Sequence, residues 1–395
     1  MVINLVTSIF LSSLIFIHMF DLETKFVIPT HGGLEDVLAK ELKQLGARDV
    51  QSNWRSVSCI GDAGFMYKAN FCLRTGLFVF AQISEFALSH QDDLPKNLEL
   101  IDWNKYLNTG QSFNVKCTST SELFDNPLSV IDSTKKIISS FFLTKFNYSI
   151  VESDIHPDVE IHISLNSKCE VLLNSTGESL ASRGYKVSCQ HESLDASMAA
   201  GLVMLSGWES HQPLIDFMCD TGTIPIEAAL WAARIPPGAF RKQYSFEKWN
   251  GFDLELFNTI RDKQIERILN NPIRVFANDN DQYKIEIAIQ NISNAGVEDM
   301  ITVTNIDFKN FDRPERNGVI LINPPFGSND DESNDFFKSI GDCFKQRYAG
   351  YKAYIFTSNP ETGKSIGLKA KQRIKLFQGN AECRLLGYEL FEGSR

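Results

Sequence analysis

The sequence lacks the residue spacings that hold a metal ion or a set of disulfides. Its eight cysteines are scattered and never form a Cys-x-x-Cys pair, and its seven histidines show no ligand spacing against them. A zinc site and a disulfide framework are therefore not expected. Reduced thiols in the cytosol are the simplest interpretation, so we predict a cytoplasmic protein that binds no metal.

The chain also lacks an excess of positive charge. It has 39 Lys and Arg against 49 Asp and Glu, a formal net charge of −10. This balance argues against non-specific binding to nucleic acid over the whole surface. Residues 364–375 differ, because they carry five basic side chains and no acidic one: Lys364, Lys369, Lys371, Arg373 and Lys375. This run is either a solvated face or a local RNA-binding face, and the sequence leaves both open.

Charged residues are absent from positions 1–20, which are mostly apolar. Their length would allow a short transmembrane span or a signal segment. A signal peptide, however, needs a positive n-region and a small-residue cleavage site, and both are missing. We favour translation from Met19, with a membrane anchor as the main competing interpretation.

The pattern Gly-x-Gly-x-x-Gly is missing at the first turn of the C-terminal half, which disfavours NAD. From residue 197 to 358 strands and helices alternate, and this predicts a doubly wound parallel sheet with helices on both faces. Residues 373–378 and 383–391 have no helix between them and predict a closing antiparallel hairpin. An α+β unit up to about residue 90 and a strand-helix-strand unit over 113–174 precede this sheet.

The most informative stretch is residues 318–327, where five strand-forming residues run into Asn323-Pro324-Pro325-Phe326. Two prolines have no N–H to give, so the strand must stop there. The Asn323 Oδ1 and the Pro324 carbonyl can both accept hydrogen bonds from an –NH2 group, and Phe326 can stack on a flat ring. A plain turn after a buried strand is the alternative. The rarity of the tetrapeptide favours a site for a base that carries an exocyclic amine.

Other strand ends in this half carry acidic residues, and ligands of doubly wound sheets lie at the carboxyl ends of the strands. The loop from Asp216 to Thr223 leads into a helix and offers free N–H groups to a carboxylate. An acid at Asp279 can take both hydroxyls of a ribose, and one at Asp307 can accept from an adenine amine. Each acid alone could be a helix cap. Together they predict a site for S-adenosylmethionine beside a nucleobase, with these cofactor-binding candidates: Asp216, Cys219, Gly222, Thr223, Asp279 and Asp307.

Several motifs resemble those of the bacterial large-subunit ribosomal RNA guanine-N2 methyltransferases. They are Gly33-Leu34-Glu35, Ser182-Arg183-Gly184-Tyr185, Ser206-Gly207-Trp208, Asp216 to Ala229, Asn278–Asp281, Asn323–Gly327 and Lys375–Cys383. The resemblance implies an α+β ferredoxin-like and THUMP RNA-binding module before an α/β Rossmann-like methyltransferase domain. It implies the divisions 1–20 (apolar extension), 21–60 (ferredoxin-like), 61–175 (THUMP) and 176–395 (methyltransferase).

The resemblance also implies functional residues. Asn323, Pro324, Pro325 and Phe326 would hold guanine N2, and S-adenosylmethionine would be the methyl donor. The partner would be structured RNA, with ribosomal RNA expected. From their positions at the domain junction and near the carboxyl edge of the sheet, we predict one RNA-facing side made of Arg183, Tyr185 and the basic run with Lys369 and Lys371.

The sequence departs from the family pattern in three places. Asp220 replaces the first glycine of the cofactor loop, so its backbone must adopt a negative φ or be strained. Residues 193–196 lose the two charged side chains of the family's Pro-Leu-Lys-Glu, and 327–329 lose an arginine. Two interpretations compete: an active methyltransferase with an altered pocket, or an RNA-binding assembly factor with weakened cofactor binding. An adenine-directed DNA methylase is the alternative within the enzyme interpretation.

Overall fold

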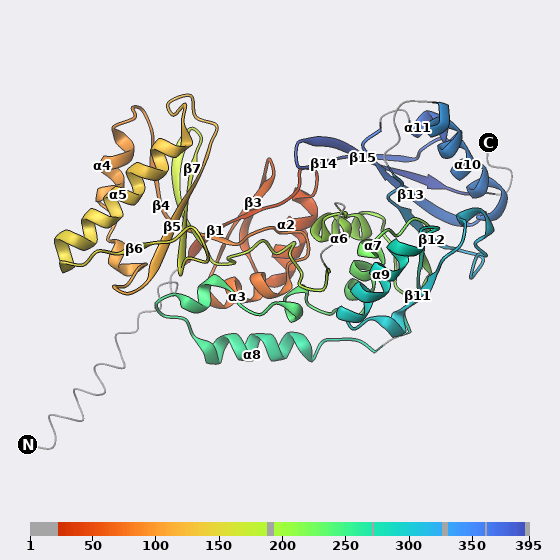
Figure 1. Ribbon diagram of the computed structural model, residues 1–395, viewed down its shortest axis with the longest axis horizontal. Helices are drawn as coiled ribbons and strands as arrows, with labels where there is room; N and C mark the ends of the chain where they lie inside the picture. Colours follow the sequence, from red (N-terminus) through yellow and green to blue (C-terminus); the bar gives the residue numbers. More distant parts are fainter. Residues whose placement is uncertain (1–22, 188–192, 271, 326–330, 360–361, 392–395) are drawn as a thin grey trace, which may run out of the picture.

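Two β-sheets organise the computed structural model, which describes residues 23–187, 193–270, 272–325, 331–359 and 362–391 (Figure 1). Residues 1–20, and with them the choice between a start at Met19 and a membrane anchor, lie outside the described residues. Within the described ranges, no helix is both long and apolar enough to cross a membrane.

The N-terminal sheet has eight strands in the order β2-β3-β1-β4-β8-β7-β5-β6. Strand β4 pairs with both β1 and β8, so one sheet runs without a break through the first two predicted divisions. Its strands are β1 (Thr24–Pro29), β2 (Arg48–Asn53), β3 (Ser56–Gly61), β4 (Phe80–Ala87), β5 (Ser112–Ser119), β6 (Val151–Glu152), β7 (Val159–Leu165) and β8 (Lys168–Asn174). Its helices are α2 (Glu35–Leu45), α3 (Ala63–Cys72), α4 (Asp93–Glu99) and α5 (Pro127–Phe146).

Helix α5 shows how the local sequence sets an element's bounds. The Asn126 side chain caps its first turn by accepting from the Leu128 N–H at 2.9 Å, and Pro127 occupies the first turn. Asn147 ends the helix in the left-handed conformation at φ 51°. Every fourth residue is buried, which gives one apolar stripe against the sheet: Val130, Thr134, Ile138 and Phe142.

The C-terminal sheet has the order β11-β10-β9-β12-β13-β15-β14. Strand β15 runs antiparallel to its two neighbours, β13 and β14, and the remaining neighbouring strands pair in parallel. The predicted doubly wound sheet and closing hairpin are confirmed. Its strands are β9 (Leu214–Asp216), β10 (Val275–Asn278), β11 (Ile301–Thr304), β12 (Gly318–Ile322), β13 (Tyr351–Thr357), β14 (Gln372–Gln378) and β15 (Ala381–Glu389). Its helices are α6 (Ala196–Leu205), α7 (Thr223–Ala232), α8 (Leu254–Ile265), α9 (Gln282–Asn294), α10 (Asp331–Arg347) and α11 (Thr362–Ser365).

Strand β12 is buried on both faces, because its residues alternate between two separate apolar clusters. Val319 and Leu321 pack with α6, α7 and α9, whereas Ile320 and Ile322 pack with α10. Helices therefore cover both faces of the sheet (Figure 1). A continuous apolar run without polar alternation is what such a doubly covered strand requires.

A buried ion pair lies where the two halves of the molecule meet. The Arg183 Nε lies 3.2 Å from Glu227 Oε1 on α7, and the two side chains are 1% and 0% exposed. Arg183 also donates to the backbone oxygens of Leu180 and Arg74, and the Tyr185 hydroxyl donates to Glu227 at 3.0 Å. Arg74, which precedes β4, in turn donates to carbonyls of the α7 region. The α3–β4 connection is thereby fixed to the helix that follows β9.

A second contact between the halves uses one of the positions that depart from the family pattern. Asp195 caps α6 by accepting from the backbone N–H groups of Ser197 and Met198. Its carboxylate also lies 3.1 Å from His31 Nε2, in the β1–α2 turn. Asp195 therefore serves as a helix cap and a contact to the N-terminal module.

The buried pair generates a stability prediction. We expect Arg183→Ala to lower the free energy of unfolding by about 3–5 kcal/mol, because it leaves Glu227 as an uncompensated buried charge. Urea unfolding followed by circular dichroism measures the loss. Arg48→Ala is the matched control, since Arg48 pairs with Glu23 on the surface and its loss should cost less than about 1 kcal/mol. Equal losses for the two variants would contradict the prediction.

Candidate active site

The site begins where β9 ends. Asp216 closes the strand at 1% exposure, and its Oδ1 accepts from the Met218 N–H at 3.1 Å. Strand β9 ends at Asp216, where this contact helps to turn the chain into the loop that precedes α7. Among the residues that the structure describes, Asp216 Oδ2 has no hydrogen-bond partner. Burial, and after it the charges of Asp279 and Asp220, raise the pKa of Asp216 well above its ordinary value.

The loop after β9 is held mainly through its backbone. The Cys219 N–H donates to the Asn278 carbonyl at 2.9 Å, and the Cys219 carbonyl accepts from the Gly222 N–H at 2.8 Å. Gly222 precedes α7 at φ 84°, and a Cβ there would lie 3.3 Å from the Ala288 Cβ of α9. Burial raises the pKa of the Cys219 thiol well above its usual range, which disfavours the reactive thiolate form.

The acid at the end of β10 supports this loop. Asp279 Oδ2 accepts from the Asp220 N–H at 3.0 Å, and its Oδ1 accepts from the Asp281 N–H at 3.1 Å. Asp220 takes the left-handed conformation at φ 51°, which a glycine would adopt without strain. Its carboxylate lies 3.1 Å from Lys284 Nζ on α9. Lys284 thus faces the charges of Asp220, Asp279 and Asp281, and Asp216 lies close enough to Asp279 and Asp220 to feel their charges.

The next two strand ends are linked by a residue that sequence reasoning did not single out. Asn278 is fully buried and donates to the carbonyls of Phe217 and Ile306 at 3.2 and 2.9 Å. It ties the ends of β9, β10 and β11 together. Asp307 lies beyond β11, is exposed, and accepts from the Lys309 N–H at 2.8 Å. It caps a short turn, as the cap interpretation of such acids anticipated.

Asn323 follows β12, the strand that pairs with β9, which Asp216 ends. Ile320 pairs with Ile215 in the parallel ladder, so Leu321 is level with Asp216, and Asn323 lies two residues further along the adjacent strand. Asn323 is half-buried, Pro324 is buried and Pro325 is exposed. Phe326, the proposed stacking residue, lies outside the described residues, as do 327–329 with the missing family arginine.

Unsatisfied polar atoms gather at these two strand ends. Within the described ranges, four buried side-chain oxygens here have no hydrogen-bond partner: Asp216 Oδ2, Thr221 Oγ1, Thr223 Oγ1 and Asn323 Oδ1. Leaving a buried polar atom unpaired costs roughly 1–3 kcal/mol. This edge of the sheet therefore has the character of a surface that a polar ligand completes.

The prediction that Arg183 and Tyr185 face RNA is wrong, because they are only 2% and 1% exposed. Their polar groups are used by Glu227 and by backbone carbonyls. Lys369 and Lys371 are exposed as expected, and Lys371 lies 3.5 Å from Glu389.

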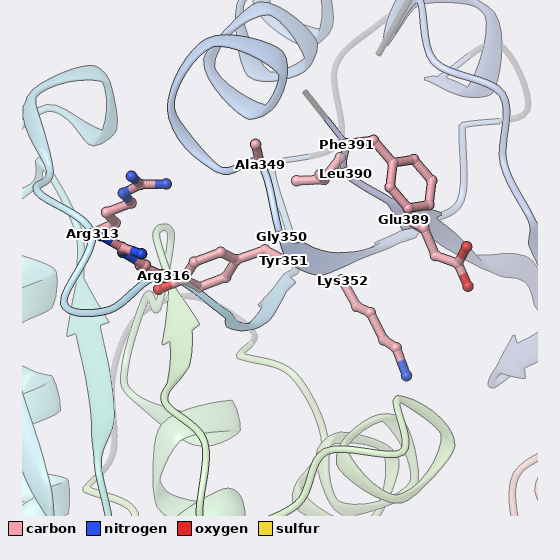
Figure 2. Close-up of a pocket in the computed structure, with 9 residues that line it drawn as sticks. All are labelled: Arg313, Arg316, Ala349, Gly350, Tyr351, Lys352, Glu389, Leu390 and Phe391. Atoms are coloured by element: carbon pink, nitrogen blue, oxygen red, sulfur yellow. The ribbon is translucent and has the colours of Figure 1, made fainter. Parts of the chain in front are cut away.

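A surface hollow of about 750 Å³ lies elsewhere, at the amino ends of β12 and β13 (Figure 2). Its walls are Arg313, Arg316, Ala349, Gly350, Tyr351, Lys352, Glu389, Leu390 and Phe391. It opens at the opposite edge of the sheet from Asp216 and Asn323, so it is not part of the candidate active site. In the described part of the chain, no three His, Cys, Asp or Glu side chains are placed to hold a metal ion.

A parallel sheet of this strand order, with an acidic loop after β9 and Asn-Pro-Pro after β12, defines a Rossmann-like methyltransferase. Residues 183–386 match the family described as "RMKL-like, methyltransferase domain", and residues 25–77 match the "RlmL ferredoxin-like domain". The chain belongs to this RMKL-like methyltransferase family.

Individual relatives agree with this assignment. The chain is 30% identical to the "Putative RNA methyltransferase slr0064" of Synechocystis sp., over 91% of this chain and 95% of that protein. It is 31% identical to the "Ribosomal RNA large subunit methyltransferase K/L" of Aliivibrio fischeri strain MJ11, over 94% of this chain but 54% of that protein. The crystal structure of SMU.472 complexed with SAH is similar with a TM-score of 0.85 at 28% identity, covering 93% of this chain and 98% of that one.

The raised pKa of Asp216 generates a pH prediction. The contribution of the protonated Asp216 carboxyl to the free energy of unfolding is fully present below its ordinary pKa of 3.8. It is lost as the pH rises through the raised pKa of the folded protein. We therefore expect Asp216→Asn to unfold at the same temperature as the wild type near pH 3.5, and at a higher temperature at pH 8. Differential scanning calorimetry without ligand checks this. Asp307→Asn, at an exposed position, should unfold at the same temperature as the wild type at both pH values. A wild type that unfolds at a higher temperature than Asp216→Asn at pH 8 would contradict the argument.

Proposed function

We propose that this protein transfers a methyl group from S-adenosylmethionine to an exocyclic amine of a nucleobase in RNA, with guanine N2 of large-subunit ribosomal RNA as the target. The observation that carries the proposal is the position of Asn323. Its unpaired, buried Oδ1 lies one strand away from Asp216, at the point where the strand order of the sheet reverses. Ligands of doubly wound sheets bind at this point.

The residues at the strand ends fit the methyl donor. Asp279 is 6% exposed at the end of β10, where a carboxylate can take the two hydroxyls of a ribose. Asp307 is available to the adenine amine, and the loop from Asp216 to Thr223 faces the methionine part. The grouped carboxylates of Asp216, Asp220 and Asp279 suit a ligand that carries an ammonium and a sulfonium cation. When bound, this cofactor supplies the methyl group on a positively charged sulfur.

The protein's part in the reaction is to hold the amine. Asn323 Oδ1 and the Pro324 carbonyl accept the two amine protons, so the nitrogen lone pair is directed away from them and towards the cofactor. Pro324 and Pro325 hold these acceptors in place because their φ angles are fixed. Positioning of this kind can contribute roughly 7–11 kcal/mol to lowering the barrier. In this scheme Phe326 stacks on the base, as its sequence position predicts.

The substrate class rests on other support. The names of the two relatives above contain RNA methyltransferase and ribosomal RNA large subunit methyltransferase. The chain spans nearly all of the first and about half of the second, so the activity of the longer proteins is carried over here only as a proposal. Guanine N2 is proposed from the tetrapeptide and the motifs it accompanies. We also propose the division into a ferredoxin-like segment at 21–60, a THUMP domain at 61–175 that binds RNA, and a methyltransferase domain at 176–395.

Asp220 favours a second candidate function, an RNA-binding assembly factor with weak cofactor binding. A non-glycine residue in the left-handed conformation costs about 1–2 kcal/mol in general, and its carboxylate adds to those of Asp216 and Asp279. The contact with Lys284 offsets part of this charge. Calorimetric titration decides between the two: heat near zero at millimolar S-adenosylmethionine, regained by Asp220→Gly, would support the second candidate.

Asn323 provides the direct test of catalysis. We expect Asn323→Ala to bind S-adenosylmethionine within about threefold of the wild type, because the cofactor-holding acids are untouched. Methyl transfer to protein-free large-subunit ribosomal RNA should fall by about a hundredfold or more, since a polar group aligned with the reacting atoms is lost. Incorporation of labelled methyl groups measures the rate.

Asn310→Ala, an exposed asparagine after Asp307, is the matched control and should keep full activity. Undiminished transfer by Asn323→Ala would overturn the proposed role. Preferential methylation of duplex DNA by the wild type would overturn the RNA substrate while leaving the amine-holding role intact.

A further inference from the structure

Two family motifs without a catalytic role come together in space. Gly33, of Gly33-Leu34-Glu35, has φ 90°, and a Cβ on it would lie 2.3 Å from the Lys375 carbonyl of β14. The Phe377 N–H donates to the Gly32 carbonyl at 2.9 Å. The β1–α2 turn of the N-terminal module is therefore seated directly on β14 of the methyltransferase sheet, and only a glycine permits this approach.

The same contact positions the β2–β3 turn. Glu35 Oε2 accepts from the Gly33 N–H at 2.7 Å, and Oε1 accepts from the Arg55 N–H at 2.9 Å. The Arg55 guanidinium donates to the Gly379 carbonyl in the β14–β15 turn. Both turns are thus fixed by hydrogen bonds in addition to the apolar contact of Leu34 and Leu376, and they present a preformed surface.

Aromatic and cationic side chains meet on this surface, which we call the junction patch (Trp54, Arg55, Lys375 and Phe377). Trp54 is 67% exposed and meets Phe377 edge-on, with ring centroids 5.1 Å apart. The Arg55 Cζ lies 5.6 Å from the Trp54 centroid and 5.5 Å from that of Phe377. Lys375 Nζ lies 5.1 Å from the Phe377 centroid. An exposed tryptophan among cations has the composition of a platform for unpaired nucleotides.

The register of the sheet places the junction patch at the edge that carries the candidate active site. Strand β14 is parallel to β13 by way of β15: Thr357 pairs with Arg384, which pairs with Lys375. Because Ile322 pairs with Ile355, Pro324 is level with Thr357 and hence with Lys375. Three strand-to-strand steps of about 4.8 Å put the patch roughly 14 Å from the tetrapeptide along this edge. Nucleotides next to a target base lie within such a span.

The charges around the patch are complementary to a phosphate backbone. Along β14, Arg373 and Lys371 add exposed cations on the N-terminal side of the patch. Acids are present too: Glu382 lies 2.7 Å from Lys375, and Glu389 lies 3.5 Å from Lys371. These are surface pairs, which are worth little and are screened by salt. Phosphates can therefore compete for both lysines.

We propose that the junction patch binds a single-stranded RNA segment beside the target base, with a nucleobase stacked on Trp54 and phosphates on Arg55 and Lys375. This extends the proposed function, on which it rests for the identity of the polymer. It gives the basic run at 364–375 a role that Arg183 and Tyr185 do not share, and it requires both halves of the molecule in their observed contact.

Trp54 allows a sharp test because it is exposed and distant from the cofactor-holding acids. We expect Trp54→Ala to weaken binding to protein-free large-subunit ribosomal RNA by between about fivefold and a hundredfold, the range for losing one base stack. Trp54→Phe should retain most of the affinity, and calorimetric binding of S-adenosylmethionine should be unchanged in both. Phe391→Ala removes another exposed aromatic ring at the opposite sheet edge, and as the matched control it should bind RNA like the wild type.

A spectroscopic readout separates this proposal from the proposed function. A short oligouridylate should quench wild-type tryptophan fluorescence and leave Trp54→Phe unquenched, since Trp103, Trp208 and Trp249 are buried and the half-buried Trp231 lies on α7 against Trp208. Lys375→Glu should reduce the slope of the logarithm of the binding constant against the logarithm of the salt concentration by about one unit. If the wild type methylates RNA but Trp54→Ala binds it with full affinity, the patch proposal is overturned. If quenching occurs without methylation of any RNA, the patch proposal stands and the proposed function fails.

Discussion

The divergence of two neighbouring strand ends is the constraint on which the rest of this structure depends. Strand β9 leads into α7 on one face of the sheet, and β12 leads towards α10 on the other. At these two strand ends, Asp216 Oδ2 and Asn323 Oδ1 have no hydrogen-bond partner in the described structure. A fold tolerates such a cost, roughly 1–3 kcal/mol for each atom, where a ligand supplies the partners. The apolar packing of β12 on both faces keeps these atoms in place.

The N-terminal module is coupled to this edge through α7 and β14. Glu227, the partner of Arg183, lies one turn after the cofactor loop on α7, and the Gly33 contact fixes the module against β14. A rotation of the module would break the hydrogen bonds of Arg74 with Arg183 and the α7 region, or force Gly33 into the Lys375 carbonyl. Under the proposed function, an RNA bound by the module would meet the carboxyl edge of the sheet in one orientation.

Local sequence pattern predicted the elements that carry strong periodicity or sharp stops. β12 with its Asn-Pro-Pro ending and the closing hairpin are found as expected. The edge strand β2 has no buried residue, and α8 buries only Phe257, so neither gave an apolar pattern to detect. The burial of Arg183 depends on a partner 44 residues away, and the Asp195 contact on one 164 residues away. Such long-range pairs leave no trace in local spacing, which is why an exposed RNA-facing role was wrongly predicted for Arg183.

The replacement of the family's glycine by Asp220 adds a negative charge to the loop after β9. S-adenosylmethionine carries a sulfonium that becomes a neutral sulfide once the methyl group has left, so the ligand loses one positive charge on reaction. If this loop holds the cofactor as proposed, the carboxylates of Asp220 and Asp279 would favour the charged form over the neutral one, and low dielectric would strengthen the preference. The same carboxylate that opposes the cofactor's own carboxylate therefore also opposes retention of the product. Because the Asp220 N–H still anchors Asp279 and its φ matches that of a glycine, the substitution changes the electrostatics of the loop while preserving its backbone path.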